Sequence, residues 1–156
     1  MSEPEKRIRR FVIDTNVFVS AIKPFSKHIR ESHKDVNTLS LLIKLIVNED
    51  LELVGNSRPV DEYKRLSEEL DSETSRLILR NLTRKMKIVE VNVAALMNCK
   101  PYLPAEESAD VIHAATSLQT NAILITNDKD FDRIRRSEII RVWSISEAIR
   151  NLLTNE

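Results

Sequence analysis

The chain has 156 residues, of which 42% are hydrophobic, and its 24 basic side chains balance 24 acidic ones. This length predicts one domain with a sizeable core, covering residues 1–156, and the composition is that of an ordinary soluble protein. The best apolar run, residues 39–47, is interrupted by Lys44 and is too short to cross a bilayer. The charged N-terminus, MSEPEKRIRR, lacks the apolar stretch that a secretory signal needs. Because Cys99 is the only cysteine, we expect a protein of the reducing cytoplasm, without a membrane segment.

The scarcity of glycine, cysteine and histidine excludes several kinds of site. A phosphate-binding P-loop and a dinucleotide fingerprint each need two or three glycines, and Gly55 is the only glycine in the chain. The nucleophile elbow G-x-S-x-G is also absent. Cys99 stands alone, which excludes an internal disulfide and a multi-cysteine zinc site, and the 3 histidines do not form the zinc-binding H-E-x-x-H pattern. By elimination, we expect any chemistry to rest on carboxylates.

In chain order, short apolar runs alternate with longer segments of helical periodicity, which is typical of an α/β fold. Five runs are predicted strands: residues 10–14, 51–54, 87–91, 122–126 and 139–143. Five segments are predicted helices: residues 39–48, a helix capped by Ser57, 73–86, 106–120 and 146–153. The polar, basic residues 23–37 are predicted to be a long loop or a poorly anchored helix. We therefore expect a single α/β domain whose central, mostly parallel sheet of about five strands is flanked by helices.

Three acidic residues lie just beyond predicted strands. Asp14 ends the first strand, Glu62 lies in the first turn of the helix after the second strand, and Asp128 follows the fourth strand. Open α/β sheets bind their ligands beyond the carboxyl ends of the strands. We therefore expect these carboxylates to lie at one edge of the sheet.

Helical phase adds Asp110 to this group. Asp110 falls at the edge of an apolar stripe formed by Val111, Ala115, Leu118 and Ala122. Its neighbours on the same side, Ala114 and Ser117, are small and would leave space around the carboxylate. In the helix after Ser57, Glu62 borders the apolar residues and Asp61 points away from them, so phase favours Glu62 over Asp61.

Each acid also has an ordinary structural interpretation. Asp14 could cap the following helix, Glu62 could complement a helix dipole, Asp110 could lie on a solvated helix face and Asp128 could form a turn. Carboxylates gathered without counter-charges would repel one another and destabilise the fold. A bound divalent cation resolves that repulsion, and Mg²⁺ with one or two carboxylates and several waters suits phosphodiester chemistry.

Three parts of the sequence resemble the PIN domain family. They are FVIDTNVFVSAI (residues 11–22), Glu62, and SADVIHAATSLQTNAILITNDKDFDRI (residues 108–134). The resemblance covers nearly the whole chain in order and length. It implies a metal-dependent nuclease similar to the toxins of prokaryotic toxin–antitoxin pairs.

The resemblance also implies roles for individual residues. Four acids would form the catalytic and metal-binding cluster: Asp14, Glu62, Asp110 and Asp128. Asp130 is a second candidate for the fourth acid, because it lies only two residues after Asp128. Asn16 matches a polar position that supports the first Asp, and Thr126 matches a hydroxyl beside the cluster.

The function that we predict is hydrolysis of RNA phosphodiester bonds at a carboxylate-bound Mg²⁺ or Mn²⁺. The metal would lower the pKa of a bound water and stabilise charge on the phosphoryl oxygens. One alternative is a catalytically inactive PIN-like protein that acts through protein or RNA contacts. A phosphatase-like or receiver-type α/β protein is a third possibility, which the helix-borne Asp110 disfavours.

Two basic segments flank the predicted acids and are candidates for binding RNA phosphates. The candidate substrate-binding residues are Lys23, Lys27, Arg30, Arg133 and Arg136. The alternative is that these charges are solvated surface. As partners, the resemblance implies RNA, a second copy of the chain in a homodimer and, for a toxin, a small antitoxin.

Residues outside the acidic cluster have structural interpretations. His113 is predicted to be structural or exposed rather than catalytic, Trp143 to lie in the core, and Cys99 to be a small buried apolar residue. The amphipathic residues 74–86, which include Leu77, are predicted to pack internally rather than to form an interface.

Overall fold

The computed structural model describes residues 9–25, 36–104 and 108–153. Its centre is a sheet with the strand order β3-β2-β1-β4-β5, in which every strand pairing is parallel. The strands are β1 (Arg9–Ile13), β2 (Leu51–Gly55), β3 (Lys87–Ile88), β4 (Ile123–Ile125) and β5 (Arg141–Trp143). The predicted α/β class, with a parallel sheet of about five strands, is confirmed.

The central strands are apolar throughout because both faces of the sheet are covered. In β1, Phe11 and Ile13 face one hydrophobic cluster and Val12, between them, faces another. In β4, Ile123 and Ile125 share the cluster of Phe11, whereas Leu124 shares that of Val12. The alternation follows from the two-residue period of a strand, and it explains why these runs are continuous apolar sequences.

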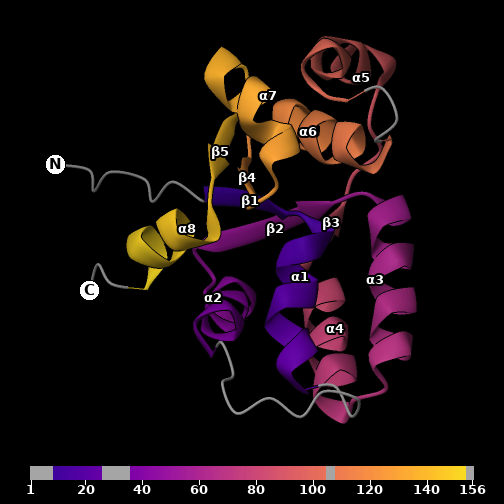
Figure 1. Ribbon diagram of the computed structural model, residues 1–156, viewed down its shortest axis with the longest axis vertical. Helices are drawn as coiled ribbons and strands as arrows, with labels where there is room; N and C mark the ends of the chain where they lie inside the picture. The colour runs from indigo at the N-terminus through magenta and orange to yellow at the C-terminus, as the bar shows by residue number, and fades with distance from the viewer. Residues whose placement is uncertain (1–8, 26–35, 105–107, 154–156) are drawn as a thin grey trace, which may run out of the picture.

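Helices cover the two faces of the sheet (Figure 1). One face carries α1 (Thr15–Ile22), α2 (Val36–Val47), α3 (Ser57–Leu70), α4 (Glu73–Lys85) and α8 (Ile145–Leu152). The opposite face carries α5 (Val93–Cys99), α6 (Ser108–Thr120) and α7 (Asp132–Ser137). Right-handed crossovers require this split, because the chain moves outward from β1 to β3 and then returns past β1 to β4.

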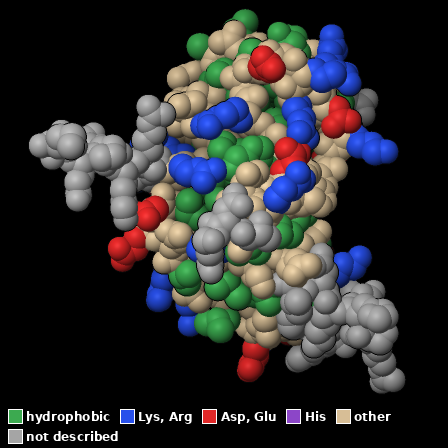
Figure 2. All heavy atoms as spheres, turned by 90° about the vertical axis from the view of Figure 1, so that its left-hand side faces the viewer, with side chains coloured by type: hydrophobic (Ala, Val, Ile, Leu, Met, Phe, Trp, Pro, Cys, Tyr) green, Lys and Arg blue, Asp and Glu red, His purple; other side chains and the backbone are tan. Residues whose placement is uncertain are grey.

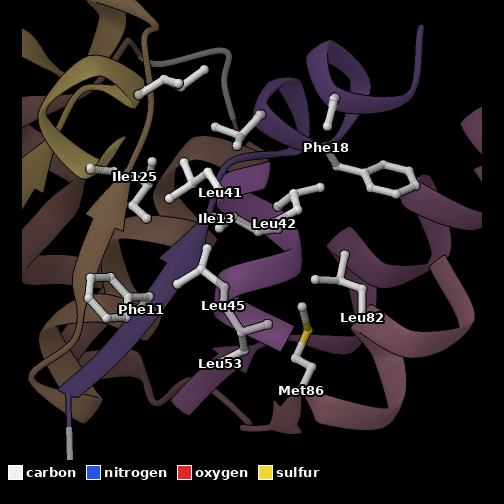
Figure 3. Close-up of a cluster of buried hydrophobic side chains, with 14 of the residues drawn as sticks. Phe11, Ile13, Phe18, Leu41, Leu42, Leu45, Leu53, Leu82, Met86 and Ile125 are labelled. Atoms are coloured by element: carbon white, nitrogen blue, oxygen red, sulfur yellow. The ribbon is translucent and has the colours of Figure 1, made fainter. Parts of the chain in front are cut away.

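The larger of the two clusters lies between the sheet and α1, α2, α4 and α8. Figure 3 shows Phe11, Ile13, Leu53 and Ile125 of the sheet beside Leu41, Leu42 and Leu45 of α2. On the other face, α6 presents Ala114 and Ala115, both fully buried, so this helix can approach the sheet closely. Burial on both faces fixes the positions of β1 and β4, whose carboxyl ends carry the acids.

Several predictions of secondary structure were wrong in detail. Ser57 is not the cap of α3: Asn56 is, because its side-chain oxygen accepts a hydrogen bond from the Arg58 amide at 3.0 Å. The third strand is only Lys87–Ile88, and helices α5 and α7 were not predicted. Leu77 on α4 is 57% exposed, so the internal packing predicted for residues 74–86 holds for Ile78 and Leu82 but not for Leu77.

Other expectations can be compared directly. Cys99 is buried and free, as predicted, and Trp143 is partly buried against the larger cluster. In residues 23–37, η1 (Lys23–Phe25) is a short 3₁₀ helix and α2 begins at Val36, while residues 26–35 lie outside the described part. Among the helices that the structure describes, none combines the length and the apolar character needed to span a membrane.

The strand order also decides between α/β classes. Receiver-type proteins have the strand order 2-1-3-4-5, whereas this sheet has the order 3-2-1-4-5. The receiver-type alternative is therefore excluded by topology.

Candidate metal centre

The predicted acids gather where the order of the strands reverses. β1 and β4 are neighbours in the sheet, and the chain leaves their carboxyl ends in opposite directions. In open α/β sheets the crevice at such a point is the usual ligand site. Asp14 follows β1 directly, and its amide donates a hydrogen bond to the Ile125 carbonyl at 3.0 Å, which joins the two strand ends. The fold therefore sets Asp14 at the bottom of this crevice.

Asp14 is only 4% exposed, and a hydroxyl holds its carboxylate in place. The Thr126 Oγ1 donates to Asp14 Oδ2 at 2.8 Å, so the end of β4 fixes the side chain at the end of β1. Asp14 occupies the N-cap position of α1 but makes no side-chain capping hydrogen bond. Capping alone therefore does not explain an acid at this position.

The surroundings of Asp14 raise the pKa of its carboxyl above the ordinary value. Burial is the main cause, and the charge of Asp128 adds to it. The Thr126 hydroxyl and the backbone N–H groups of Asn16 and Thr15 act in the opposite direction. A positive charge beside Asp14 would offset the effect of burial and favour its ionised form.

Three further carboxylates lie together at this edge. Asp110, Asp128 and Asp130 each contribute one carboxylate oxygen to a group in which these atoms lie within 4.8 Å of one another. Asp110 is buried and comes from the first turn of α6, whereas Asp128 and Asp130 are half-buried and come from the segment after β4. The sequence left open whether Asp128 or Asp130 is the fourth acid, and the geometry brings both together with Asp110.

The segment after β4 is held in one shape by its own polar groups. The Asp128 amide donates to Thr126 Oγ1 at 3.0 Å, and the Asp130 amide donates to Asp128 Oδ1 at 2.9 Å. Asn127 reaches away from the acids, and its Oδ1 accepts from the Ile145 amide at 2.8 Å. Thr126 therefore serves two acids at once, because its hydroxyl binds Asp14 and orients Asp128.

The helical phase used for α6 was partly wrong. Val111 and Leu118, expected at the centre of the buried stripe, are half-buried against the smaller cluster. Residues 112–117 are all buried, so burial extends around the helix, and Asp110 is buried as well. The error arose because α6 is covered by both the sheet and α5, which conceals its amphipathic pattern. Asp110 is consequently more buried than its position at the edge of a stripe indicated.

Glu62 lies at the edge of the centre, where its charge acts on the buried His113 beside Asp14. Its side chain is 41% exposed and forms an ion pair with Arg65 at 3.6 Å. It lines a small hollow of about 180 Å³ together with Arg58, Ala109 and Ile112, and so faces the start of α6. Asp61 is exposed on the outer side of α3, as phase indicated.

Sequence reasoning missed two buried polar side chains beside Asp14. His113 Nε2 lies 3.9 Å from Asp14 Oδ1 and 3.4 Å from Thr15 Oγ1. Burial lowers the pKa of His113 to about 4, so its imidazole is uncharged near neutral pH. The Tyr63 hydroxyl donates to the Ile13 carbonyl at 2.6 Å, and burial raises its pKa well above the ordinary value.

A sequence signal existed for each of these side chains. His113 lies three residues after Asp110 and therefore shares its helix face, while Tyr63 follows Glu62 on the buried face of α3. Of the two alternatives predicted for His113, structural or exposed, the structure excludes exposure: the side chain is buried and adjoins Asp14.

The predicted phosphate-binding residues are divided by the structure. Arg133 and Arg136 are exposed on α7 and line, with Lys129 and Asp130, a hollow of about 440 Å³ beside the acids. Lys23 lies at the far end of α1, whose eight residues span about 12 Å from the end that carries Asp14. Lys27 and Arg30 lie outside the described residues. Asn16 is exposed in the first turn of α1.

Comparison with known proteins identifies the class to which this fold and site belong. The PIN domain model matches residues 11–137, which includes both strand ends and all the acids described above. The chain belongs to the PIN domain family. No curated protein matches the chain in sequence.

Solved structures with a similar fold include chains from two bacteria. A chain of VapBC2 from Rickettsia felis, solved with a DNA fragment from its promoter, is 19% identical with a TM-score of 0.56; the match covers 86% of this chain and 98% of that one. A chain of VapBC-1 from nontypeable Haemophilus influenzae is 17% identical with a TM-score of 0.56, covering 88% and 98%. At this identity the likeness concerns the fold.

The donor set fits a small, hard divalent cation. All the converging ligands are carboxylate oxygens, which suit Mg²⁺ and Mn²⁺, and the described residues offer no thiolate near them that would favour a softer metal. Half-buried Asp128 and Asp130 leave one side of the group accessible to water and substrate. Gathered negative charge around a buried Asp14 is the electrostatic arrangement that a cation relieves.

Proposed function

We propose that this protein is a metal-dependent endonuclease that hydrolyses RNA phosphodiester bonds. The observation that carries the proposal is the grouping of Asp110, Asp128 and Asp130 within 4.8 Å, next to buried Asp14, in a member of the PIN domain family. Without a cation, such a group would only weaken the fold.

In this proposal, Asp110, Asp128 and Asp130 hold Mg²⁺ or Mn²⁺, with Asp14 beside them. When bound, the cation supplies an acidified water and stabilises charge on the phosphoryl oxygens. Thr126 keeps the Asp14 carboxylate in one orientation through the 2.8 Å hydrogen bond to Oδ2. Uncharged His113 closes the inner side of the site without adding a competing positive charge.

Glu62 and the arginines of α7 have peripheral roles in this proposal. Glu62, on the rim, lines a small hollow together with Arg58 and faces the start of α6. Arg133 and Arg136 offer guanidinium groups to the RNA backbone on the opposite side, beside Asp130. Arg135, between them, is paired with Glu147 at 2.7 Å and so contributes to the contact of α7 with α8 instead.

The biological setting is part of the same proposal. The sequence resembles the toxins of toxin–antitoxin pairs, and its fold matches chains of VapBC2 and VapBC-1. We include in the proposal a small antitoxin that blocks the site, a homodimeric assembly and a cytoplasmic location. The single domain over residues 1–156 also remains a prediction.

A labelled single-stranded RNA tests the activity. Incubation with Mg²⁺ or Mn²⁺ should give cleavage that EDTA abolishes, and a single-stranded DNA of the same sequence should be cut more slowly. The matched binding measurement is the thermal transition with and without the metal. If neither cleavage nor a metal-induced shift is observed, the protein is a catalytically inactive PIN domain and the proposal is wrong.

A further inference from the structure

A second concave site adjoins the acidic centre. It is a cavity of about 550 Å³ between the N-terminus of α3, the segment from β3 into α5, and α6. This volume falls within the range of pockets that bind small organic groups. Asn56 helps to form its edge, because its side-chain amide donates to the Val89 carbonyl at 3.1 Å while its oxygen caps α3. The walls are therefore connected to one another before any ligand binds.

The cavity adjoins the small hollow at the edge of the metal centre. Arg58 and Ile112 line both this cavity and the small hollow that contains Glu62 and Ala109. Asp110 lies between Ala109 and Ile112 on α6, so the wall of the cavity begins one turn of helix or less from a proposed metal ligand. An RNA strand bound at the acids can thus extend by one nucleotide into this cavity.

The lining has the composition that a nucleotide requires. Val91, Leu96, Val111 and Ile112 supply apolar walls suited to a flat base. Arg58 and Lys100 supply positive charge for a phosphate, and the exposed Glu90 supplies an acceptor for N–H groups. Proteins recognise single-stranded RNA in this way, by stacking an unpaired base on side chains and hydrogen-bonding to its edge.

We infer that this cavity binds the nucleotide next to the scissile phosphate and selects a base with an exocyclic amino group through Glu90. The base lies between Leu96 and Val111, and its phosphate faces Arg58. A carboxylate accepts hydrogen bonds from the exocyclic amino groups of adenine, cytosine and guanine, whereas uracil has no amino group and offers only its ring N3–H. The inference rests on the proposed function, since the occupant is part of the RNA that the acids would cleave.

The competing occupant is a second copy of this chain. Val93 and Met97 on α5 are 69% and 67% exposed and could extend an apolar contact from the cavity. The charges of Lys100 and Glu90 favour the nucleotide, because protein interfaces are depleted of lysine and glutamate. The same variants distinguish the two occupants when oligomeric state is measured with RNA binding.

The first test fills the cavity. Binding of a fluorescent oligoribonucleotide is measured by anisotropy in the Asp14→Asn chain, with Mg²⁺ present, so that cleavage does not interfere. Val111→Phe should weaken binding about tenfold, whereas Val93→Phe, at an exposed position of α5, should not. Arg58→Ala, a change of an exposed side chain, should weaken binding as well and is not expected to affect folding. Unchanged RNA binding by both cavity variants would overturn the inference. So would cavity variants that no longer form a dimer but bind RNA with the affinity of the parent.

The second test concerns base selection. Glu90→Gln should reduce the preference for amino-bearing bases over uracil by about tenfold, with Glu68→Gln on the exposed face of α3 as the matched control. Equal preference before and after Glu90→Gln would contradict the role of this residue. Binding is measured separately from cleavage. A protein that binds RNA through the cavity but does not cleave it would refute the proposed nuclease activity without contradicting RNA binding in the cavity.

Discussion

At the scale of single residues, the carboxyl of Asp14 lies in surroundings that are unfavourable to its charge when no cation is bound. The carboxyl is buried, faces the charge of Asp128, and is held by the Thr126 hydroxyl and by backbone N–H groups rather than by a charged basic partner. Its pKa in the folded protein is raised above 3.8, so the folded state retains this proton at pH values where the unfolded chain has lost it. The contribution of Asp14 to stability therefore falls as the pH rises through the raised pKa.

The raised pKa of Asp14 leads to a prediction for the stability of Asp14→Asn. Without metal at neutral pH, the variant should be at least as stable as the parent, because the amide removes the buried charge and keeps the size of the side chain. Adding Mg²⁺ or Mn²⁺ at a hundred times its Kd should stabilise the folded parent by about 2.7 kcal/mol and so raise its thermal transition. The thermal transition of the variant should rise much less. Thermal melts in EDTA and in metal measure both effects. A variant that is clearly less stable in EDTA would show that Asp14 is a structural residue.

His113 gives a second prediction, with the opposite pH dependence. Its folded pKa of about 4 lies below the ordinary value of 6.5, so between these values the unfolded chain binds a proton that the folded chain refuses. Stability should therefore fall as the pH drops from 6.5 towards 4, by up to about 1.4 kcal/mol per pH unit for this one proton. Urea unfolding in EDTA at several pH values should show a shallower slope for His113→Gln. Equal slopes for the two chains would mean that His113 titrates normally.

The residues of the centre were partly evident from the sequence. Asp14, Asp110 and Asp128 follow from strand ends, helical phase and family resemblance, and the structure places them at one edge of the sheet. Glu62 was expected to complete the site, and the structure places it, partly exposed, at the edge of the centre, where its charge acts on His113. The proximity of His113 to Asp14 depends on the packing of α6 across β1, which no local pattern encodes.

At the scale of elements, the N-terminus of α3 connects the acidic centre to the neighbouring cavity. Asn56 caps α3 and also binds the Val89 carbonyl, so one buried side chain links β2, α3 and the segment after β3. Asn92 caps α5 in the same way but is exposed. The two residues form a natural pair for comparing a buried cap with an exposed one.

We predict that Asn56→Ala destabilises the fold by about 2 kcal/mol and Asn92→Ala by about 1 kcal/mol. The buried variant loses the cap and leaves the Val89 carbonyl without its side-chain donor, whereas the exposed variant loses a bond that water can replace. Denaturant unfolding at equilibrium measures both free energies. Equal losses in the two variants would show that the bond to Val89 contributes nothing.

The elements that sequence reasoning missed are short or partly concealed. α5 has seven residues and α7 has six, and neither is long enough to show a full amphipathic period. β3 pairs through only Lys87 and Ile88, at the edge of the sheet, so the apolar pattern of residues 87–91 overstated its length. The central strands and longer helices were predictable because burial imposes a period on their sequences.

At the scale of the whole molecule, a net charge of zero means that attraction of RNA must be local. Figure 2 shows Lys and Arg side chains at several separate points on the side of β5 and α8, among acidic and hydrophobic side chains. Of the cations predicted to bind phosphate, Arg133 and Arg136 have the clearest relation to the acids, because they share a hollow with Asp130. Charge balance in the sequence did not reveal this placement.

We predict that Arg133→Ala with Arg136→Ala raises KM for RNA and leaves kcat nearly unchanged. The salt dependence of binding should become shallower by about one to two counterions, because each phosphate contact contributes roughly one. The pair Arg80→Ala with Arg84→Ala, exposed on α4, serves as the control for loss of two charges. An unchanged salt slope in the α7 variant would exclude these arginines from RNA binding.

The family, the topology and the acidic centre together support one central claim, that Asp110 is a metal ligand of an RNA-cleaving site. The most direct test is the initial rate of cleavage of single-stranded RNA in Mg²⁺ by Asp110→Asn, compared with Asp61→Asn on the exposed side of α3. The account predicts that Asp110→Asn slows cleavage on the order of 100-fold or more, with its thermal transition in EDTA preserved, while Asp61→Asn cleaves like the parent. Cleavage by Asp110→Asn at the rate of the parent would contradict it.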